Sequence, residues 1–414
     1  MTTSNRRRPE TAQWLKASNS ITQQFLAFGG RADVVSLAGG LPAAELYPIE
    51  AIGEAARRAL ETLGAAALEY GAVEGFLPLR RLIAERMAAE TGGAFTAANV
   101  LLTSGSMQAL DLIGKVLIDP GDLIVAQAPT YLGALDAWRP RRPAYLPLDW
   151  QAQDVETLAR AKFAYAVPNY SNPTGVLVPQ DRRAALLDKV RAAGTWLVED
   201  DPYLTMQLDG PPGPSILARD VARSRGAYDG SVIYLGTVSK SLVPGLRVGW
   251  VVAAAGMIQS LALAKQATDL SSSMFTQAVA LDLLERDVDR RHSASIVPVY
   301  RERRDALVSE AALRLSEWFE WEVPPGGMFV WMRSKDRAID TDELYRFAVE
   351  EKVAFVPSSV FDFTGEDRYA MRVNFTRSSP ELIREGVRRL GRAIDTYASS
   401  RPQLGRRAGP NSRR

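Results

Sequence analysis

The middle of the chain alternates short apolar runs with longer segments in which apolar residues recur at helical spacing. Asn99–Thr103 has the pattern of a strand, Ser106–Ile118 that of a helix, and Leu123–Gln127 that of a second strand. Further strands are predicted at Ala164–Val167, Thr195–Glu199, Val232–Leu235 and Val248–Ala253, and a further helix at Pro179–Ala193. This alternation predicts βαβ units and a mostly parallel sheet.

The pattern changes after about residue 295. The elements predicted there are a long polar helix near Val297–Leu313, a hairpin-like pair of strands at Glu320–Val323 and Met328–Met332, a strand at Tyr369–Phe375 and a helix at Pro380–Ala398. Because strands and helices are segregated here, we expect a second, smaller α+β domain.

The chain is therefore divided into four parts. Residues 1–45, with a helix near Thr11–Phe28, are expected to pack with the small domain; residues 46–295 form the large domain and residues 296–399 the small one. Residues 400–414 are rich in Arg, Gly and Pro, and we expect a disordered basic tail.

Composition excludes several kinds of chemistry. The 414 residues include no cysteine and one histidine, His292, so disulfides, thiolate zinc sites, iron–sulfur ligation and cysteine nucleophiles are ruled out. His292 closes the charged run Asp289–His292 and is expected to be an exposed surface residue. Catalysis must then come from carboxylates, hydroxyls, lysine, arginine or a bound organic cofactor.

Charge and hydropathy indicate an ordinary globular protein. Apolar residues make up 46% and charged residues 24%, and 50 basic side chains meet 48 acidic ones, so no net field favours nucleic acid or a membrane surface. No apolar stretch follows Arg6–Arg8, and no run reaches the roughly 18 apolar residues of a membrane span. We expect a cytoplasmic protein with no nucleic-acid or membrane partner.

The most informative segment is Gly236–Trp250. Lys240, one of only 8 lysines, stands just past an apolar strand between hydroxyl residues, and an arginine follows seven positions later. Burial lowers the pKa of a lysine and makes it a good Schiff-base nucleophile. Thr237, Ser239 and Arg247 are donors suited to a phosphate. Taken alone, the segment equally fits an exposed surface lysine.

Four other stretches place polar groups beside predicted strands. Ser104–Met107 separates a strand from a helix, where N–H groups could face an anion or Ser could simply cap the helix. Pro168–Gly175 brings an amide to a strand end, although such runs are usually turns. Val198–Tyr203 puts acids where open α/β sheets bind ligands, or in a cap or loop. Met371–Phe375 sets an arginine in an apolar strand, where it needs an anion unless it faces water.

These motifs, in this order from Leu37 to Arg377, resemble the fold-type I pyridoxal-phosphate enzymes, specifically class I aminotransferases of the 2-aminoadipate and kynurenine type. Ser36–Pro42 and Tyr70–Gly75 also resemble that subgroup. The resemblance implies an α/β fold whose large, cofactor-binding domain has a mostly parallel seven-stranded-type sheet flanked by helices, with a smaller α+β domain formed by both termini. It further implies pyridoxal 5'-phosphate, amino acid and 2-oxo acid substrates, and a homodimer.

The resemblance also implies roles for individual residues. Lys240 would carry the cofactor as a Schiff base and then move the substrate proton. Asp200 would pair with the pyridine nitrogen and keep it protonated. Tyr203 and Asn172 would hydrogen-bond the ring hydroxyl, and Tyr131 would stack on the ring.

The remaining carried-over roles concern the phosphate and the substrate. The phosphate would be bound by Gly105, Ser106, the Met107 amide, Thr237, Ser239 and Arg247, with Tyr70 reaching in from a partner subunit. Arg372 would hold the substrate α-carboxylate, and Gly40 and Asn172 would line the substrate pocket.

Two positions depart from the family pattern. Relatives usually carry glutamine where this chain has Met107, so one side-chain contact near the cofactor is lost. Aminoadipate-type members place an arginine on the N-terminal helix, and the ungapped position here is Gln23, beside Ile21 and Phe25. The second departure favours a neutral or aromatic amino donor.

Two alternatives to transamination remain open. Fold and cofactor do not decide which bond breaks, so a decarboxylase, lyase, cyclase or oxidase acting on an amino acid fits the same motifs. A transcription regulator with an aminotransferase-like domain is a different class of protein. Only about 35 residues precede Ser36, fewer than the roughly 50 of an independent DNA-binding domain.

Overall fold

The computed structural model describes residues 10–16, 31, 33–223 and 226–401. The predicted N-terminal helix is described only at α1 (Gln13–Lys16). Ile21, Gln23, Phe25 and most of the predicted basic tail lie outside the described residues.

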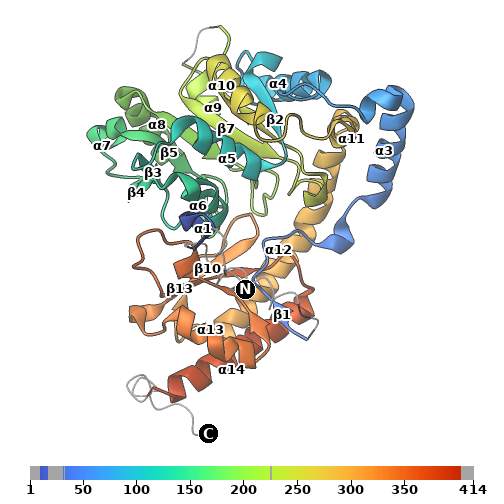
Figure 1. Cartoon of the computed structure of the whole chain (residues 1–414). Coiled ribbons are helices and arrows are strands. Elements are labelled where there is room, and N and C mark those ends of the chain that lie inside the picture. The colour runs from blue at the N-terminus through green and yellow to red at the C-terminus, as the bar shows by residue number, and fades with distance from the viewer. Residues whose placement is uncertain (1–9, 17–30, 32, 224–225, 402–414) are drawn as a thin grey trace, which may run out of the picture.

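A seven-stranded sheet forms the centre of the upper lobe in Figure 1. Its order is β2 (Val100–Thr103), β8 (Gly249–Val252), β7 (Val232–Thr237), β6 (Trp196–Asp200), β5 (Ala161–Ala166), β3 (Leu123–Ala126) and β4 (Ala144–Pro147). Only β8 runs antiparallel to its neighbours. The predicted α/β class and mostly parallel sheet are confirmed. The prediction missed β4, a short and mostly exposed edge strand that ends in a proline, a residue uncommon in strands.

Helices cover both faces of this sheet. α5 (Ser106–Leu117), α6 (Leu132–Trp138) and α10 (Ala255–Gln266) contribute to one apolar core. The second core, on the opposite face, includes side chains of α3 (Ile49–Leu63), α4 (Leu77–Thr91), α7 (Val155–Arg160), α8 (Gln180–Ala193), α9 (Ile216–Val221) and α11 (Met274–Glu285). Alternate strand residues, such as Leu101 and Leu102, belong to different cores because successive strand side chains point to opposite faces.

The lower lobe contains a four-stranded antiparallel sheet in the order β12 (Val356–Pro357), β13 (Ala370–Asn374), β10 (Phe329–Ser334) and β9 (Phe319–Glu320). Helices α13 (Thr341–Glu350) and α14 (Pro380–Ser399) belong to the same lobe. β1 (Val35–Ser36) pairs with β11 (Val353–Ala354), so the N-terminal segment joins the C-terminal lobe. This arrangement is the smaller domain formed by both termini that the sequence predicts.

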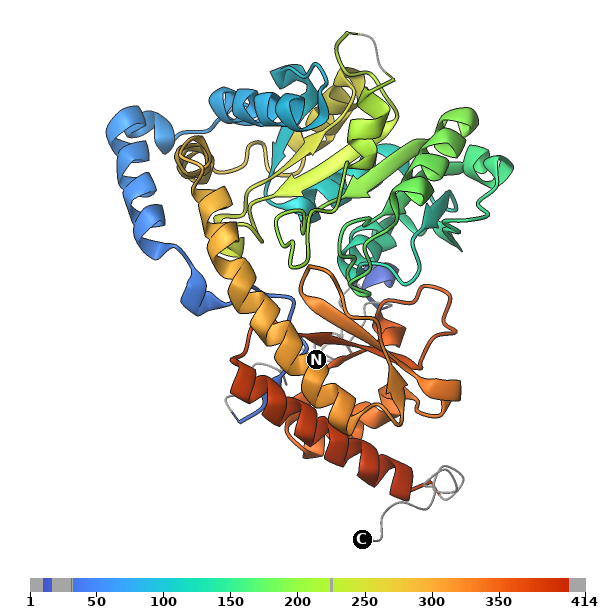
Figure 2. The same cartoon turned by 180° about the vertical axis from the view of Figure 1, so that it is seen from behind.

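Helix α12 (Val288–Arg314) runs from one lobe to the other (Figure 2). It is longer than the predicted helix, and the proposed domain boundary at 295/296 falls within it. His292 lies on α12 and is half-buried, so the expectation of an exposed histidine was wrong. Burial lowers its pKa.

The two strands of the predicted hairpin, β9 and β10, pair only at the end away from their connection. Glu320 lies opposite Arg333, and the connection between the strands turns toward the upper lobe, where the Gly327 N–H donates to the Met206 carbonyl at 2.9 Å. The connection thus ties the two lobes together instead of forming a tight turn.

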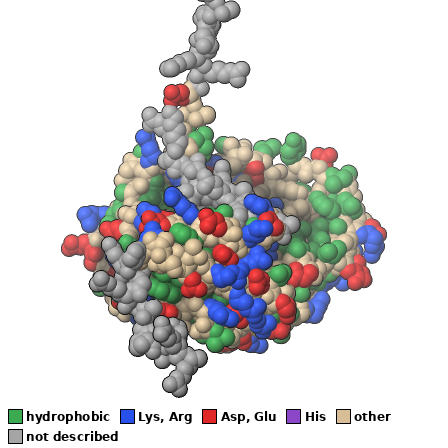
Figure 3. Space-filling model, turned by 90° about the horizontal axis from the view of Figure 1, so that it is seen from below, with side chains coloured by type: hydrophobic (Ala, Val, Ile, Leu, Met, Phe, Trp, Pro, Cys, Tyr) green, Lys and Arg blue, Asp and Glu red, His purple; other side chains and the backbone are tan. Residues whose placement is uncertain are grey.

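Basic and acidic side chains lie beside one another on the face seen in Figure 3. Opposite charges also pair along α14, where Arg389 lies 2.9 Å from Glu385. In the described part of the chain, no helix has both the length and the apolar character needed to cross a membrane.

Candidate active site

A cavity of about 470 Å³ brings most of the predicted site residues together. The predicted residues that line it are Gly40, Ser106, Met107, Tyr131, Asn172, Asp200, Tyr203, Thr237, Ser239, Lys240, Arg247 and Arg372. Gly105 is the N-cap of α5 and immediately precedes Ser106 in the chain. Tyr70 does not line the cavity and is 83% exposed. The cavity lies at the carboxyl ends of β6 and β7, where open α/β sheets bind ligands.

Lys240 follows β7 and projects toward the N-terminal segment. Its Nζ donates to the Gly40 carbonyl at 2.8 Å. Burial, with a smaller contribution from the charges of Arg372 and Arg247, lowers the pKa of Lys240 to about 8. The amine is therefore far more often neutral, and nucleophilic, than a surface lysine at the same pH.

Asp200 ends β6 and is buried. Its Oδ2 accepts a hydrogen bond from the Tyr165 hydroxyl at 2.8 Å, while its Oδ1 is buried with no hydrogen-bond partner among the described residues. Burial raises the pKa of Asp200 to about 7, with the Tyr165 hydrogen bond opposing and the charge of Asp201 adding to the rise. An unpaired buried carboxylate oxygen is costly, so it fits a protonated ring nitrogen of a bound cofactor.

Tyr165 was not predicted from the sequence. It occupies an otherwise apolar stretch of β5, and nothing in that pattern distinguishes it from a core aromatic residue. Only the alignment of β5 beside β6 brings its hydroxyl to Asp200.

The loop before α5 has the features of a phosphate site. Gly105 has φ 79°, and a Cβ there would lie 2.5 Å from Arg247 Nη2, so only glycine fits. The Ser106 hydroxyl is buried without a hydrogen-bond partner in the described structure. Arg247 Nη2 donates to the Ser104 carbonyl at 2.9 Å, and the Thr237 and Ser239 hydroxyl oxygens lie 2.8 Å apart. Together with a helix N-terminus, these donors fit the phosphate of pyridoxal phosphate.

Arg372 lies on β13 and is buried. Its guanidinium donates to Asn172 Oδ1 at 2.8 Å and to the Ala38 carbonyl at 2.7 Å. It also lies 4.2 Å from the ring centre of Phe329 and 4.9 Å from that of Phe361. Burial lowers its pKa to about 10, and no described carboxylate forms an ion pair with it. A buried cation without an anion suits a substrate carboxylate.

The tyrosines of the site are held in their neutral form. Burial raises the pKa of Tyr131 to about 12, and it raises the pKa of Tyr203 as well. The Tyr131 hydroxyl contacts the Met107 sulfur at 3.6 Å. The neighbour of this hydroxyl is therefore a weak hydrogen-bond acceptor.

The rest of the cavity wall is mostly apolar, with Leu41, Leu132, Val360 and Phe361 among its residues. Besides Asp200, Asp136 is the one carboxylate among the described lining residues. The prediction missed the Ala38 carbonyl and the two phenylalanines that enclose Arg372, because they come from three other segments of the chain and meet it only through the packing of those segments.

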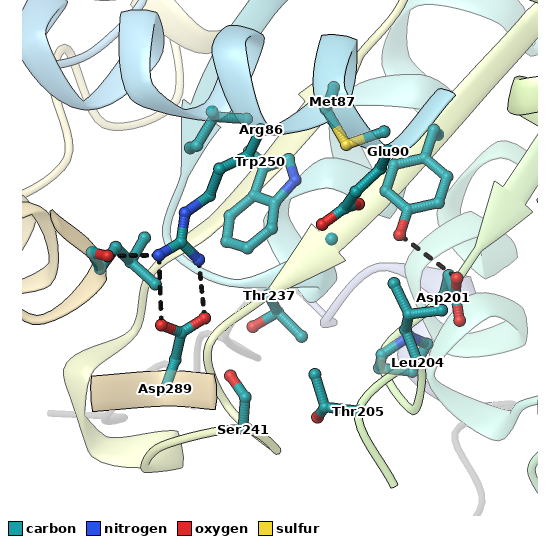
Figure 4. A pocket seen from close by; sticks show the side chains of 15 residues that line it. Arg86, Met87, Glu90, Asp201, Leu204, Thr205, Thr237, Ser241, Trp250 and Asp289 are labelled. Atoms are coloured by element: carbon teal, nitrogen blue, oxygen red, sulfur yellow. Dashed lines mark hydrogen bonds and ion pairs between the residues drawn. The ribbon is translucent and has the colours of Figure 1, made fainter. Parts of the chain in front are cut away.

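A second cavity adjoins the first and shares Pro202 and Thr237 with it (Figure 4). The ion pair between Arg86 and Asp289, at 2.8 Å, borders one side. Its volume of about 90 Å³ is enough for a few water molecules and too small for an amino acid on a cofactor. The larger cavity is therefore the candidate active site.

Comparison with known proteins gives consistent results. The sequence model of the family "Aminotransferase class I and II" matches residues 32–390. The chain is 39% identical to aromatic-amino-acid aminotransferase 1 of Thermococcus litoralis, over 93% of each chain. It is also 39% identical to 2-aminoadipate transaminase of Thermus thermophilus, over 91% of this chain and 94% of that protein.

A solved structure agrees with this likeness. The kynurenine aminotransferase of Pyrococcus horikoshii, crystallised with PMP, superposes with a TM-score of 0.86 at 35% identity. The match covers 94% of this chain and 97% of that one.

Proposed function

Because the chain belongs to the class I and II aminotransferase family and is a pyridoxal-phosphate-dependent transaminase, we propose that its amino donor is a neutral or aromatic L-amino acid, with a 2-oxo acid as acceptor. The observation that carries this proposal is the distribution of charge around the cavity. The described cationic residues that line it are Lys240, Arg247 and Arg372.

Each of these cations has a task that leaves it unavailable for a distal carboxylate. Lys240 is the attachment site of the cofactor, Arg247 faces the phosphate and Arg372 faces the α-carboxylate. The part of the cavity left for the substrate side chain is lined by apolar residues and Asp136. The negative charge of Asp136 disfavours a distal carboxylate on the substrate. The named substrates of two relatives, aromatic amino acids and kynurenine, are compatible with such a wall, whereas 2-aminoadipate carries a distal carboxylate.

The proposed roles of the residues follow from their positions. When bound, pyridoxal phosphate supplies an electron sink for the bond that breaks at the substrate Cα. Asp200 holds the proton on the ring nitrogen, and Arg372 orients the substrate by its α-carboxylate. Lys240, with a pKa lowered by burial, takes the proton from Cα. Tyr203 and Asn172 would hydrogen-bond the ring hydroxyl of the bound cofactor, and Tyr131 would stack on its ring.

We also propose a homodimer in the cytoplasm. Tyr70 is assigned to the partner's phosphate site, and its exposure is compatible with that assignment. Ile49 and Leu68, on neighbouring elements, are 73% and 72% exposed, which is unusual for large apolar side chains and suits a covered interface.

The attachment site is tested by replacing Lys240. The Lys240→Ala protein should lose the visible absorbance of the covalently bound cofactor and its transaminase activity, while its circular dichroism stays that of the wild type. Lys115→Ala, a lysine on the outer part of α5, is the control and should retain both properties. An unchanged spectrum and activity in Lys240→Ala would show that the assignment is wrong.

The donor class is tested by single-turnover reactions of the wild-type enzyme. Glutamine and glutamate form one matched pair that differs in charge, and phenylalanine and 2-aminoadipate are compared as well. We expect the uncharged members to react at least about tenfold faster, since an uncompensated distal carboxylate costs more than about 1.4 kcal/mol in such a pocket. Equal or faster reaction of the two acids would contradict the proposal.

A further inference from the structure

An ion pair with one fully buried partner lies outside the cavity, at the end of α10. The Lys265 side chain is fully buried, and its Nζ donates to Asp269 Oδ1 at 2.8 Å. Neither residue lines the candidate active site. Removing the Lys265 ammonium from water is expensive, and the Asp269 side chain, 24% exposed, keeps only part of its hydration; an apolar residue in place of Lys265 is often at least as stabilising. The pair therefore calls for an explanation beyond stability.

The second oxygen of Asp269 reaches α5. Asp269 Oδ2 accepts from Gln108 Nε2 at 2.7 Å and from the Ser272 hydroxyl at 3.3 Å. A carboxylate only accepts, so it fixes the Gln108 amide with its NH₂ group toward Asp269 and its oxygen away from it. Burial would raise the pKa of Asp269, yet the hydrogen bonds from Lys265 and Gln108 hold it below its usual value.

The oriented amide then contacts the phosphate loop. Gln108 Oε1 accepts the backbone N–H of Ser104 at 2.8 Å, and the carbonyl of Ser104 accepts from Arg247 Nη2 at 2.9 Å. The Ser104 hydroxyl donates to the Ser272 hydroxyl at 3.3 Å. One continuous series of hydrogen bonds therefore runs from Lys265 to the guanidinium that faces the phosphate.

The loop needs such support because its backbone is unusual. Gly105 has a positive φ of 79° and leads directly into Ser106, whose hydroxyl has no partner in the described structure. The Ser104 N–H and carbonyl, held by Gln108 and Arg247, are the groups just before this turn. A shift of the Ser104 backbone would move both the Ser106 hydroxyl and the N-terminus of α5 relative to Arg247.

We propose that Lys265 and Asp269 are positioning residues that set, through Gln108 and Ser104, the geometry in which Ser106 and Arg247 hold the cofactor phosphate. The inference rests on the proposed function, and specifically on the phosphate-binding roles of Ser106 and Arg247. An ordinary core ion pair would affect only the stability of the protein, so the two explanations differ in a measurable way.

Two substitutions interrupt the series at different points. Asp269→Asn keeps the shape but replaces one acceptor oxygen with a donor, which cannot receive hydrogen bonds from both Lys265 and Gln108. Gln108→Met removes the contacts to Asp269 and Ser104 and leaves the ion pair in place, so it carries the test even if Asp269→Asn does not fold. The matched control is Asp111→Asn, which alters the Asp111–Lys115 pair, also four residues apart and 2.7 Å long, on α5.

The experiment compares a ligand that has the phosphate with one that lacks it. Holoenzyme is stripped of cofactor, and dissociation constants are measured for pyridoxal phosphate and for pyridoxal, together with the ³¹P shift of the bound phosphate and the melting temperature. We expect Asp269→Asn and Gln108→Met to weaken pyridoxal phosphate binding about tenfold and pyridoxal binding less than about twofold, with a displaced ³¹P signal. Asp111→Asn should match the wild type.

The outcomes separate this inference from the function it rests on. If the wild type prefers pyridoxal phosphate and both variants keep that preference in full, the positioning role is wrong even if they melt earlier. If the wild type binds the two compounds equally, the assignment of the phosphate site is wrong and this inference falls with it.

Discussion

The cationic side chains that line the cavity differ in how they are held. Arg247 is exposed and donates to the Ser104 carbonyl, so it can follow a phosphate with small movements. Arg372 is buried and held by two hydrogen bonds and two aromatic rings. A side chain held in this way is preorganised, and little conformational entropy is lost when a carboxylate binds.

The rigidity of Arg372 gives a prediction for the conservative replacement. Arg372→Lys should lower kcat/KM for the amino acid about 100-fold, because a lysine keeps the charge but loses the planar fork and the stacking. The absorbance of the bound cofactor should not change. Steady-state kinetics and the visible spectrum measure the two effects.

Arg333→Lys is the control for this change. Arg333 lies on the neighbouring strand β10 and pairs with Asp367 at 3.0 Å outside the cavity. Its replacement should leave kcat/KM within about twofold, as expected for a surface pair. An Arg372→Lys enzyme with wild-type kinetics would contradict the carboxylate role.

At the scale of elements, the carboxyl end of β6 concentrates three consecutive buried acids. Burial raises the pKa of Glu199 and of Asp200 to about 7 and that of Asp201 to about 6. Glu199 accepts backbone N–H groups of Ile216 and Leu217 at 2.8 Å each, whereas Asp200 faces the cavity. Burial at this strand end therefore disfavours the charged form of all three carboxyl groups, and for Asp200 a cation beside it in the cavity would offset this cost.

The raised pKa values make the cofactor-free protein sensitive to pH. Between about pH 4 and pH 7 the folded state binds more protons at these groups than the unfolded state, so their contribution to stability falls as pH rises through that window. Asp200→Asn removes one of these groups and should stabilise the cofactor-free protein at pH 8, by at most on the order of 4 kcal/mol.

Melting curves of cofactor-free wild type and Asp200→Asn at pH 5 to 8 check this prediction. The difference in melting temperature should be small at pH 5 and grow toward pH 8. Added pyridoxal phosphate should stabilise the wild type more than the variant, because a protonated ring nitrogen favours the charged carboxylate. A difference that is constant across this range would contradict it.

At the scale of the whole molecule, the proposed homodimer would share residues of its active sites between the two subunits. The proposal places Tyr70 of one subunit in the phosphate site of the other. A Lys240→Ala subunit then lacks its own attachment lysine but supplies an intact Tyr70 to its partner. A Tyr70→Phe subunit has the complementary defect.

Mixing the two inactive or weakened variants therefore tests the shared site. After subunit exchange, half of the dimers in an equal mixture are heterodimers with one intact site of two, so about a quarter of the wild-type activity should appear. Each variant alone serves as the control. A mixture no more active than the average of its components would show that Tyr70 does not act across an interface.

The sequence by itself determined the family, the cofactor and the chain order of most strands of the large sheet. Apolar periodicity is local, and it identified the strands of the large sheet except β4. The motifs around Lys240, Asp200 and Arg372 are also local, because each lies at or just beyond the end of a strand or within one, where the chain direction fixes the position of the side chain.

Only the tertiary structure decided what surrounds these residues. Tyr165 meets Asp200 because β5 lies beside β6, and Arg372 meets the carbonyl of Ala38, 334 positions away in the chain, because the N-terminal segment joins the C-terminal lobe. The series from Lys265 to Ser104 likewise joins α10 to α5. Contacts of this kind depend on how elements pack, and no periodic pattern within a single element encodes them.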